Sequence, residues 1–293
     1  MMKKILITGA NSYIGTSFER YIKENYPNDF QIDTLDMLNS KWKGYDFSIY
    51  DSVFHVAGIA HADVGNVSDE RKQLYYKVNC DLAYETAQKA KKAKVKQFIY
   101  MSSIIVYGES APYGKTKIIT KETKPKPANF YGDSKLQAEI KLSVLQDDNF
   151  NLAIIRPPMI YGPNSKGNYP VLSKLAHKLP CFPNIKNQRS MLYIENLCEF
   201  IHLLIRNNEA GLYFPQNDEY VSTTMIVKII NPKIKILGIL NLSVFISSKI
   251  PGRMGGLCNK AFGNLVYDKE MSIYNEEYCR YDLKKSIQRT EEL

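Results

Sequence analysis

Tyr131 and Lys135 are the residues whose types and spacing best suit proton transfer in this sequence. Residues four positions apart share a face of a helix, so the two side chains should be neighbours. A lysine ammonium stabilises a phenolate, and it should therefore lower the pKa of the phenol from about 10. Such a phenol can act as an acid or a base on an alcohol or ketone near neutral pH. The pair predicts hydride chemistry in which Tyr131 moves the proton.

The same spacing also occurs at Tyr113 with Lys117 and at Tyr281 with Lys285, so spacing alone cannot choose. The first alternative lies in a turn-rich segment, where helical geometry is not expected. The second lies near the C-terminus, far from any candidate cofactor strand. Tyr131 instead opens an expected helix, and context therefore favours it.

Ser103 lies where a hydroxyl could hold a substrate oxygen beside the phenol. The strand expected at 97–102 ends in a pair of serines, and the helix expected at 131–145 begins with Tyr131. Ligands bind at the carboxyl ends of strands in parallel sheets. We therefore expect Ser103, Tyr131 and Lys135 to form one catalytic group.

The segment between the strand expected at 4–8 and the helix expected at 14–25 is suited to a dinucleotide. A glycine at the turn lets the backbone bend sharply, and the helix N-terminus offers free N–H groups and a positive dipole to a pyrophosphate. Two spaced glycines are a weak signal, and an ordinary tight turn is the alternative, but the order of strand, loop and helix favours cofactor binding. The predicted contacts are Gly9, Asn11, Ser12, Tyr13, Ile14 and Gly15.

Asp36 follows the second expected strand, where an acid can bind the adenosine ribose hydroxyls. Asp33 is the fallback for this role, and a solvated turn aspartate is the alternative reading of Asp36. A carboxylate at this place would repel the 2′-phosphate of NADP. NAD is therefore the favoured cofactor, with NADP as the alternative.

The first half of the chain alternates short apolar runs with longer amphipathic ones, which predicts strand-helix-strand units around a parallel sheet. A short polar stretch after the second strand indicates one abbreviated crossover. The expected strands are 4–8, 30–35, 52–56, 97–102 and 152–156, and the expected helices are 14–25, 74–93, 131–145 and 195–206.

After Arg156 prolines become frequent and the periodicity blurs, which indicates a second, smaller domain. The predicted fold class is α/β: a Rossmann-type doubly wound parallel sheet with a smaller, interleaved α+β C-terminal substrate domain. We place the cofactor domain at 1–160, with 186–206 returning to it. The substrate domain then comprises mainly 161–185 and 207–293.

The net charge of +9 suits anionic ligands. The densest lysine cluster, at 89–96, has the pattern of a solvated helix face, and no nucleic-acid-binding motif accompanies it, so we expect no nucleic-acid partner. Five scattered cysteines without a Cys-x-x-Cys pair favour a reducing cytoplasm. His55 and His61 flank a short turn, but no third ligand lies at a suitable spacing, so no metal site is expected.

The stretch from Ile236 to Ile246 is too short and too interrupted by polar residues to span a bilayer. We expect it to be a packing surface, with a loose contact to a membrane or a partner as the alternative. No export segment is expected at the N-terminus either, because polar residues interrupt the apolar run that begins there.

Several short motifs occur in a characteristic order: the glycine loop at 9–15, His55-Val56-Ala57-Gly58, Asn79, Ser102 to Gly108, Tyr131 to Lys135, and Arg156 to Pro163. In this order the chain resembles the extended short-chain dehydrogenase/reductases, specifically the NAD-dependent epimerase/dehydratase group that acts on nucleotide sugars. The resemblance implies that Ser103 orients the sugar oxygen, Tyr131 is the acid/base and Lys135 binds the nicotinamide ribose. Further implied cofactor contacts are Ala57, Gly58, Asn79 and Pro158. The implied substrate contacts are Ser103, Met159, Asn168 and, on the diphosphate, Arg189.

Three departures from the family pattern refine the expectation. Ser12 replaces a usual glycine and puts a side chain where the backbone approaches the pyrophosphate. Ile104 and Ile105 stand where 4,6-dehydratases need an acid pair, which argues against dehydration. Met159 stands where many epimerases have an asparagine, which shifts weight towards reduction.

The resemblance therefore favours 4-keto reduction of a UDP-linked N-acetyl-6-deoxyhexosamine in surface polysaccharide synthesis. A UDP-hexose 4-epimerase with retained NAD is the alternative within the class. A non-catalytic NAD-sensing regulatory protein is the alternative from another class. The expected partner is a UDP-sugar, and the interpretation leaves room for a homodimer.

Overall fold

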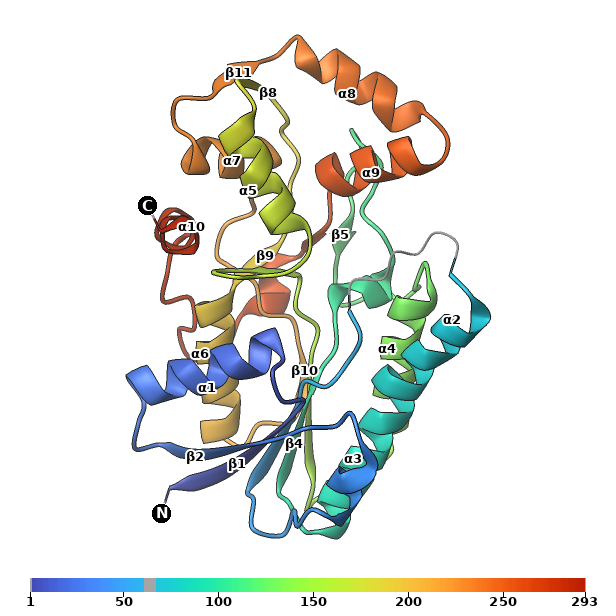
Figure 1. The fold of residues 1–293 in the computed structure, drawn as a ribbon, viewed down its shortest axis with the longest axis vertical. Coiled ribbons are helices and arrows are strands. Elements are labelled where there is room, and N and C mark those ends of the chain that lie inside the picture. The colour runs from blue at the N-terminus through green and yellow to red at the C-terminus, as the bar shows by residue number, and fades with distance from the viewer. Residues whose placement is uncertain (1, 61–66, 293) are drawn as a thin grey trace.

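A computed structural model describes residues 2–60 and 67–292 of the chain. A six-stranded sheet lies at its centre, and every neighbouring pair of strands is parallel (Figure 1). The predicted fold class is confirmed. From one edge to the other the strands are β10 (Gly211–Tyr213), β6 (Asn151–Ile155), β4 (Gln97–Met101), β3 (Ser52–His55), β1 (Lys3–Thr8) and β2 (Phe30–Leu35).

Helices cover both faces of this sheet, which explains why its central strands are continuous apolar runs rather than alternating ones. All residues of β3 and β4 are buried. On one face α1 (Tyr13–Asn25) packs against α6 (Ile194–Arg206); the other face carries α3 (Leu82–Lys92) and α4 (Phe130–Ser143) (Figure 1). The crossover between β2 and β3 is abbreviated, as predicted, to a 3-10 turn at Ser40–Gly44.

The helix expected at 74–93 begins earlier than predicted. Helix α2 (Asp69–Tyr76) starts at Ser68, whose hydroxyl accepts a hydrogen bond from the Arg71 amide, and two acids occupy its first turn. A π-helical turn, Lys77–Asp81, then joins α2 to α3. Such turns add a residue to a helix and often lie at functional sites.

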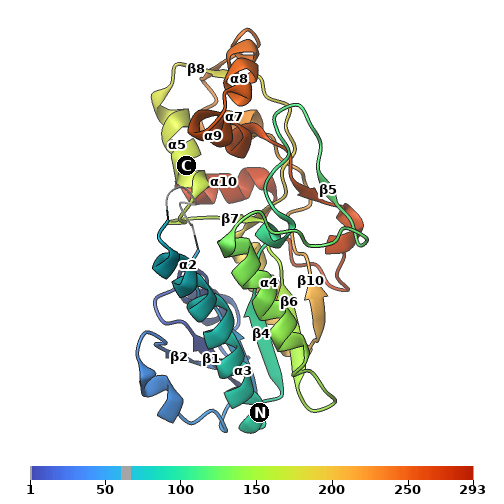
Figure 2. The same ribbon diagram turned by 90° about the vertical axis from the view of Figure 1, so that its right-hand side faces the viewer.

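The C-terminal lobe is built from short helices and two-stranded parallel ladders (Figure 2). The ladders pair β7 (Met159–Tyr161) with β9 (Met191–Tyr193), β8 (Cys181–Pro183) with β11 (Lys235–Leu237), and β5 (Ile118–Ile119) with β12 (Val266–Tyr267). The helices are α5 (Asn168–Lys178), α7 (Thr223–Ile230), α8 (Leu240–Lys249), α9 (Arg253–Phe262) and α10 (Leu283–Glu291). Our division into a cofactor and a substrate domain stays a prediction.

The stretch 236–246 is only partly a packing surface. Val244 is buried, but Ile239 is 82% exposed and Leu242 is 62% exposed, so the expectation is wrong for the outward side chains. Its second half forms most of α8, which lies at the end of the molecule farthest from the sheet (Figure 1). Within the described residues, no helix has both the length and the apolar character to cross a membrane.

Candidate active site

The glycine loop connects the carboxyl end of β1 to α1. Gly9 has a φ of 117°, and a Cβ there would lie 2.6 Å from the Ala57 nitrogen, so only glycine lets the two turns approach this closely. Gly15 packs α1 against the sheet, because a Cβ there would lie 3.1 Å from a methyl group of Ile7. Asn11 takes a left-handed conformation with a φ of 62°. The loop therefore has the sharp bend that a pyrophosphate site requires.

Ser12 is the N-cap of α1, and this explains how the chain tolerates a side chain in place of the usual glycine. Its hydroxyl accepts a hydrogen bond of 3.2 Å from the Gly15 amide. The hydroxyl therefore turns back onto the helix and occupies one of its free N–H groups. Tyr13 and Ile14 form the first helical residues beside it.

Asp36 and Asp33 differ in their exposure and in their hydrogen-bond partners. Asp36 directly follows β2, is exposed, and accepts a hydrogen bond of 2.9 Å from the Leu38 amide. Asp33 lies within β2 and accepts a hydrogen bond from the Tyr50 hydroxyl. Asp36 is therefore the carboxylate that stands at the carboxyl edge of the sheet with a side chain open to solvent.

Gly58 lies between Asn79 and Lys135 at the end of β3. A Cβ at Gly58 would lie 3.1 Å from the Asn79 Oδ1 and 3.2 Å from the Lys135 Nζ. Asn79, in the π-turn, is fully buried; it accepts a hydrogen bond from the Ile59 amide and donates one to the Ser134 hydroxyl. Asn79 thus ties the loop after β3 to the first turn of α4.

Helix α4 sets Tyr131 beside Ser103. Asn129 caps the helix by accepting a hydrogen bond from the Gly132 amide. Gly132 allows the helix to approach the turn after β4, because a Cβ there would lie 2.7 Å from the Ile105 carbonyl oxygen. That turn is the 3-10 helix Ile104–Tyr107, which Ser103 caps. The structure therefore brings Ser103 and Tyr131 together from segments that are distant in sequence.

The pKa of Tyr131 lies on the opposite side of its usual value from the one we expected. Burial raises the pKa to about 12, and a hydrogen bond with the Ser103 hydroxyl offsets only part of the increase. The Lys135 Nζ donates a hydrogen bond of 2.8 Å to the Met101 carbonyl oxygen. Tyr131 is therefore held protonated at neutral pH, as a proton donor should be.

Lys135 is almost completely enclosed. It is 6% exposed, and its ammonium lies 4.9 Å from the centre of the Tyr100 ring. Burial lowers the pKa of Lys135 to about 8, although the charge of Glu139 acts in the other direction. The side chain points to the carboxyl end of β4, which is the edge that carries the glycine loop.

A buried ion pair between Arg156 and Glu139 lies next to Lys135 on α4. We assigned this pair no role from the sequence. Arg156, at the end of β6, donates to both carboxylate oxygens of Glu139, which lies one turn after Lys135 on α4. Ser102 donates to the same carboxylate, and Arg156 also donates to the Tyr107 hydroxyl at 2.7 Å. The i,i+4 spacing of Lys135 and Glu139 was the signal that could have drawn attention to the pair.

The expected substrate residues occupy separate positions in the C-terminal lobe. Half-buried Met159 begins β7, directly after Pro158, an expected cofactor contact that is buried where β6 leads into β7. Asn168 is exposed at the first position of α5, after Gly167, whose φ is 98°. Arg189 donates hydrogen bonds to the carbonyl oxygens of Lys260 and Ala261 near the end of α9.

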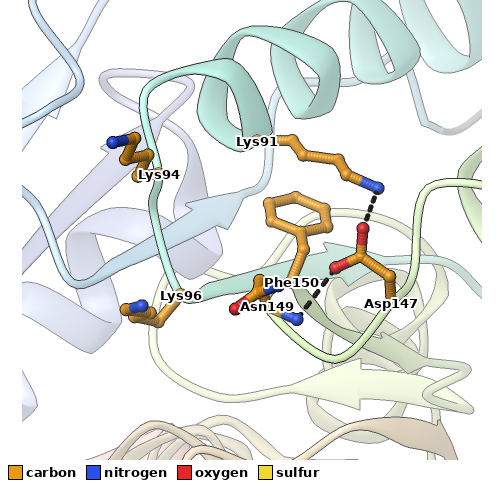
Figure 3. A pocket seen from close by; sticks show the side chains of 6 residues that line it. All are labelled: Lys91, Lys94, Lys96, Asp147, Asn149 and Phe150. Carbon is orange, nitrogen blue, oxygen red and sulfur yellow. Dashed lines mark hydrogen bonds and ion pairs between the residues drawn. The ribbon is translucent and has the colours of Figure 1, made fainter.

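A hollow at the amino ends of the strands contains none of the predicted catalytic or cofactor-binding residues (Figure 3). Lys91, Lys94 and Lys96 line it with Asp147, Asn149 and Phe150. Lys91 is already paired, because its Nζ lies 2.6 Å from the Asp147 carboxylate and also donates to the Leu145 carbonyl oxygen. The hollow lies where β4 and β6 begin, so it is separated from Tyr131 by the length of the strands.

His55 serves the core rather than a metal. It is fully buried, its Nδ1 lies 2.8 Å from the Thr8 hydroxyl, and burial lowers its pKa to about 3. His61 lies outside the described residues. Among the described residues, no group of three His, Cys, Asp or Glu side chains could hold a metal ion.

The model of the NAD dependent epimerase/dehydratase family matches residues 5–214. The chain belongs to this family. It is therefore an enzyme of a family of NAD-dependent epimerases and dehydratases, and the alternative of a non-catalytic regulator loses its support.

Two curated relatives are about 30% identical to this chain over the residues that align. A UDP-glucose 4-epimerase of Vibrio cholerae is 30% identical over 252 residues, which cover 78% of this chain and 75% of the relative. An N-acetyl-alpha-D-glucosaminyl-diphospho-ditrans,octacis-undecaprenol 4-epimerase of Escherichia coli O157:H7 is 31% identical over 232 residues, which cover 72% of this chain and 66% of the relative.

Solved structures show the same fold. The Bordetella bronchiseptica enzyme WbmG in complex with NAD and UDP is similar with a TM-score of 0.71, 18% identity and coverage of 99% of this chain and 93% of that one. At this identity the likeness supports the fold. The glycine loop, the strand ends and α4 of this family enzyme thus belong to a known architecture, whereas the roles of individual residues are inferred from their geometry.

Proposed function

We propose that this enzyme reduces the 4-keto group of a nucleotide-linked sugar, a UDP-linked N-acetyl-6-deoxyhexosamine, in the cytoplasmic synthesis of a surface polysaccharide. The proposal depends on one observation: Tyr131, a residue able to transfer a proton, lies beside the apolar turn that begins at Ile104. Tyr131 is paired with Ser103, while Ile104 and Ile105 follow directly and cannot transfer protons. Chemistry that needs one proton and no elimination of water fits this site best.

In this proposal Tyr131 donates its proton to the C4 oxygen of the sugar. The raised pKa keeps the phenol protonated until that oxygen becomes basic. The Ser103 hydroxyl holds the same oxygen by a hydrogen bond. Lys135 supplies the positive charge that stabilises the phenolate left behind, and its position under Gly58 holds it at the strand edge.

The residues present fit NAD as the bound cofactor. The close approach of Gly9 to Ala57 and the N-terminus of α1 would hold the pyrophosphate, and Asp36 would bind the adenosine ribose. Gly58, Asn79 and Pro158 would enclose the nicotinamide end together with Lys135. When bound, the nicotinamide would supply the hydride exchange at C4. The exposed carboxylate of Asp36 supports NAD over NADP.

A 4-epimerase is the second candidate, because both curated relatives described above carry this activity in their names. The same three residues would serve it, with Tyr131 also accepting a proton from the C4 hydroxyl. The substrate would then be a UDP-hexose or, by analogy with the second relative, a sugar on a polyprenyl diphosphate.

One assay separates the two candidates. The purified protein is incubated with a UDP-linked 4-keto-6-deoxy-N-acetylhexosamine and NADH, and cofactor oxidation is followed by absorbance. Stoichiometric oxidation with formation of the 4-hydroxy sugar supports reduction. Interconversion of UDP-hexose epimers, with no consumption of added cofactor, would replace the reductase by the epimerase.

A further inference from the structure

The end of the molecule farthest from the sheet exposes aliphatic and aromatic side chains on one small surface. We call it the apical surface, and it comprises Leu237, Ile239, Leu242, Phe245, Ile246 and Ile250. These residues are between 39% and 82% exposed and come from β11, α8 and the segments flanking α8 (Figure 1). Scattered exposed apolar residues are normal in proteins, but a contiguous group marks a contact with something else.

Helix α8 presents its apolar residues in the reverse of the usual direction. Val244 and Ser248 face inward and are 9% exposed, whereas the bulkier Phe245 and Ile246 face outward. A helix on the surface of a protein normally turns its apolar stripe to the core. The sequence of α8 is therefore better suited to an apolar environment outside the protein than to burial within it.

The helix is held firmly in this orientation. The Asn241 side chain donates to the Asn184 carbonyl oxygen, and the Asn259 side chain of α9 donates to the Ser248 carbonyl oxygen. Val244 belongs to a small buried cluster with Ile185 and Cys258. These contacts fix the orientation of α8, so its outward side chains stay exposed in the folded lobe.

Two long stretches of the surrounding lobe carry charge of one sign. Residues 157–194 and 220–267 together contain eleven lysines and arginines and no aspartate or glutamate, while the rest of the chain has 28 basic and 30 acidic residues. Lys233, Lys235 and Lys249 are exposed beside the apical surface. Acidic groups reach the lobe from α10, where Glu291 accepts from Ser173 of α5, on the side away from α8 (Figure 1).

We propose that the apical surface docks on an anionic lipid bilayer. An apolar helix face ringed by lysines inserts shallowly at the boundary between headgroups and acyl chains, and its lysines bind acidic headgroups. The length of α8, ten residues, suits a helix that lies on the membrane. This proposal rests on no step of the proposed reaction.

A second copy of the chain fits the apical surface less well. In a twofold dimer the same patch meets itself, so the lysines of two basic lobes would face each other without carboxylates to pair with. A nucleic acid would be attracted by the lysines, but the centre of the patch is mainly aliphatic and offers one aromatic ring for base stacking, Phe245.

Docking there would hold the proposed substrate-binding groups close to the membrane. Helix α9 packs directly against α8. The Arg189 guanidinium is bonded to the carbonyl oxygens of Lys260 and Ala261 near the end of α9. The predicted diphosphate contact is therefore one helix away from the surface that would touch lipid.

The experiment measures binding of the full chain to lipid vesicles by flotation, without substrate. Vesicles of phosphatidylcholine with phosphatidylglycerol are compared with vesicles of phosphatidylcholine alone. We expect binding to the anionic vesicles that weakens with salt. The double variant Ile239→Ser/Ile246→Ser should lower the partition coefficient about tenfold, and Lys233→Gln/Lys235→Gln should lower it by a similar factor, again about tenfold.

Ile273→Ser is the matched control, because Ile273 is 77% exposed in the segment between β12 and α10. It should bind vesicles as the unmodified chain does, and the melting temperatures of all variants should agree, which shows that the lobe is folded. Absence of binding by the unmodified chain would overturn the proposal. So would dimerisation that the apical variant abolishes, which would make a second copy the occupant.

Discussion

The carboxyl edge of the sheet and the apical surface depart from ordinary packing in opposite ways. At the sheet edge, Lys135, Glu139 and Arg156 are charged groups no more than 6% exposed. At the apical surface, Ile239 and Leu242 are apolar and mostly exposed. Burying charge costs free energy of folding, and leaving apolar area in water forgoes stabilisation. Neither arrangement is the most stable one available, and each lies where we propose a contact with another molecule.

Tyr131→Phe has the largest expected effect. It tests whether the reaction takes place at the carboxyl edge of the sheet. Loss of the proton donor should lower kcat about 10³-fold with little change in the melting temperature. Tyr281→Phe is the matched control, since Tyr281 also has a lysine four residues later, and it should retain activity within about twofold. Steady-state kinetics with NADH and the proposed UDP-linked 4-keto sugar would check both. Unchanged kcat in Tyr131→Phe removes the catalytic assignment.

Arg156→Met tests how much the buried charges depend on one another. It leaves the Glu139 carboxylate buried without its guanidinium, and the free energy of unfolding should fall by about 3 kcal/mol. Arg206→Met breaks the exposed pair with Glu276, whose side chains are 44% and 40% exposed, and should cost less than about 1 kcal/mol. Urea denaturation measures both. Equal losses would show that burial does not distinguish the two pairs.

Lys135→Met sharpens the comparison by removing a buried charge outright. Because burial lowers the pKa of Lys135 to about 8, the unfolded chain binds more protons than the folded one between about pH 8 and 10.5. The free energy of unfolding of the unmodified chain therefore rises with pH through this window. The variant should be more stable by about 3 kcal/mol below pH 8, and the advantage should vanish above pH 10.5.

The matched control for this prediction is Lys141→Met on the same helix. Lys141 is 47% exposed and pairs with Asp81, so its replacement should leave the free energy of unfolding nearly unchanged at every pH in the window. Thermal unfolding as a function of pH distinguishes the variants. A pH-independent gain in Lys135→Met would mean that the gain comes from packing and not from the charge.

The smallest effect is expected at the apical surface. Ile239→Ser removes an apolar side chain that is 82% exposed, so the free energy of unfolding should change by less than about 0.5 kcal/mol. Val244→Ser, on the inward face of α8, should cost about 1 to 2 kcal/mol because Val244 is buried with Ile185. If both substitutions were equally costly, the outward face would be packed and the comparison would fail.

Much of the α/β core was predictable because its signals are local. Buried strands are continuous apolar runs, amphipathic helices repeat every three to four residues, and the glycine loop follows the first strand; the strands at 4–8 and 30–35 were predicted within one residue. The start of α2 was missed because Ser68 and its acids were not read as a helix cap. Ser103, Tyr131 and Lys135 were likewise nominated by type and order.

What the sequence alone determined is therefore the periodicity, the order of motifs and the residues able to do chemistry. Only the tertiary structure decided how far these side chains are buried and which groups their charges contact. Burial raises the pKa of Tyr131, and the Lys135 Nζ bonds to the Met101 carbonyl oxygen, a contact between a helix and a strand whose residues are 34 positions apart. Likewise, whether an apolar run such as 236–246 faces the core or the solvent depends on what packs against it, and no local pattern records that.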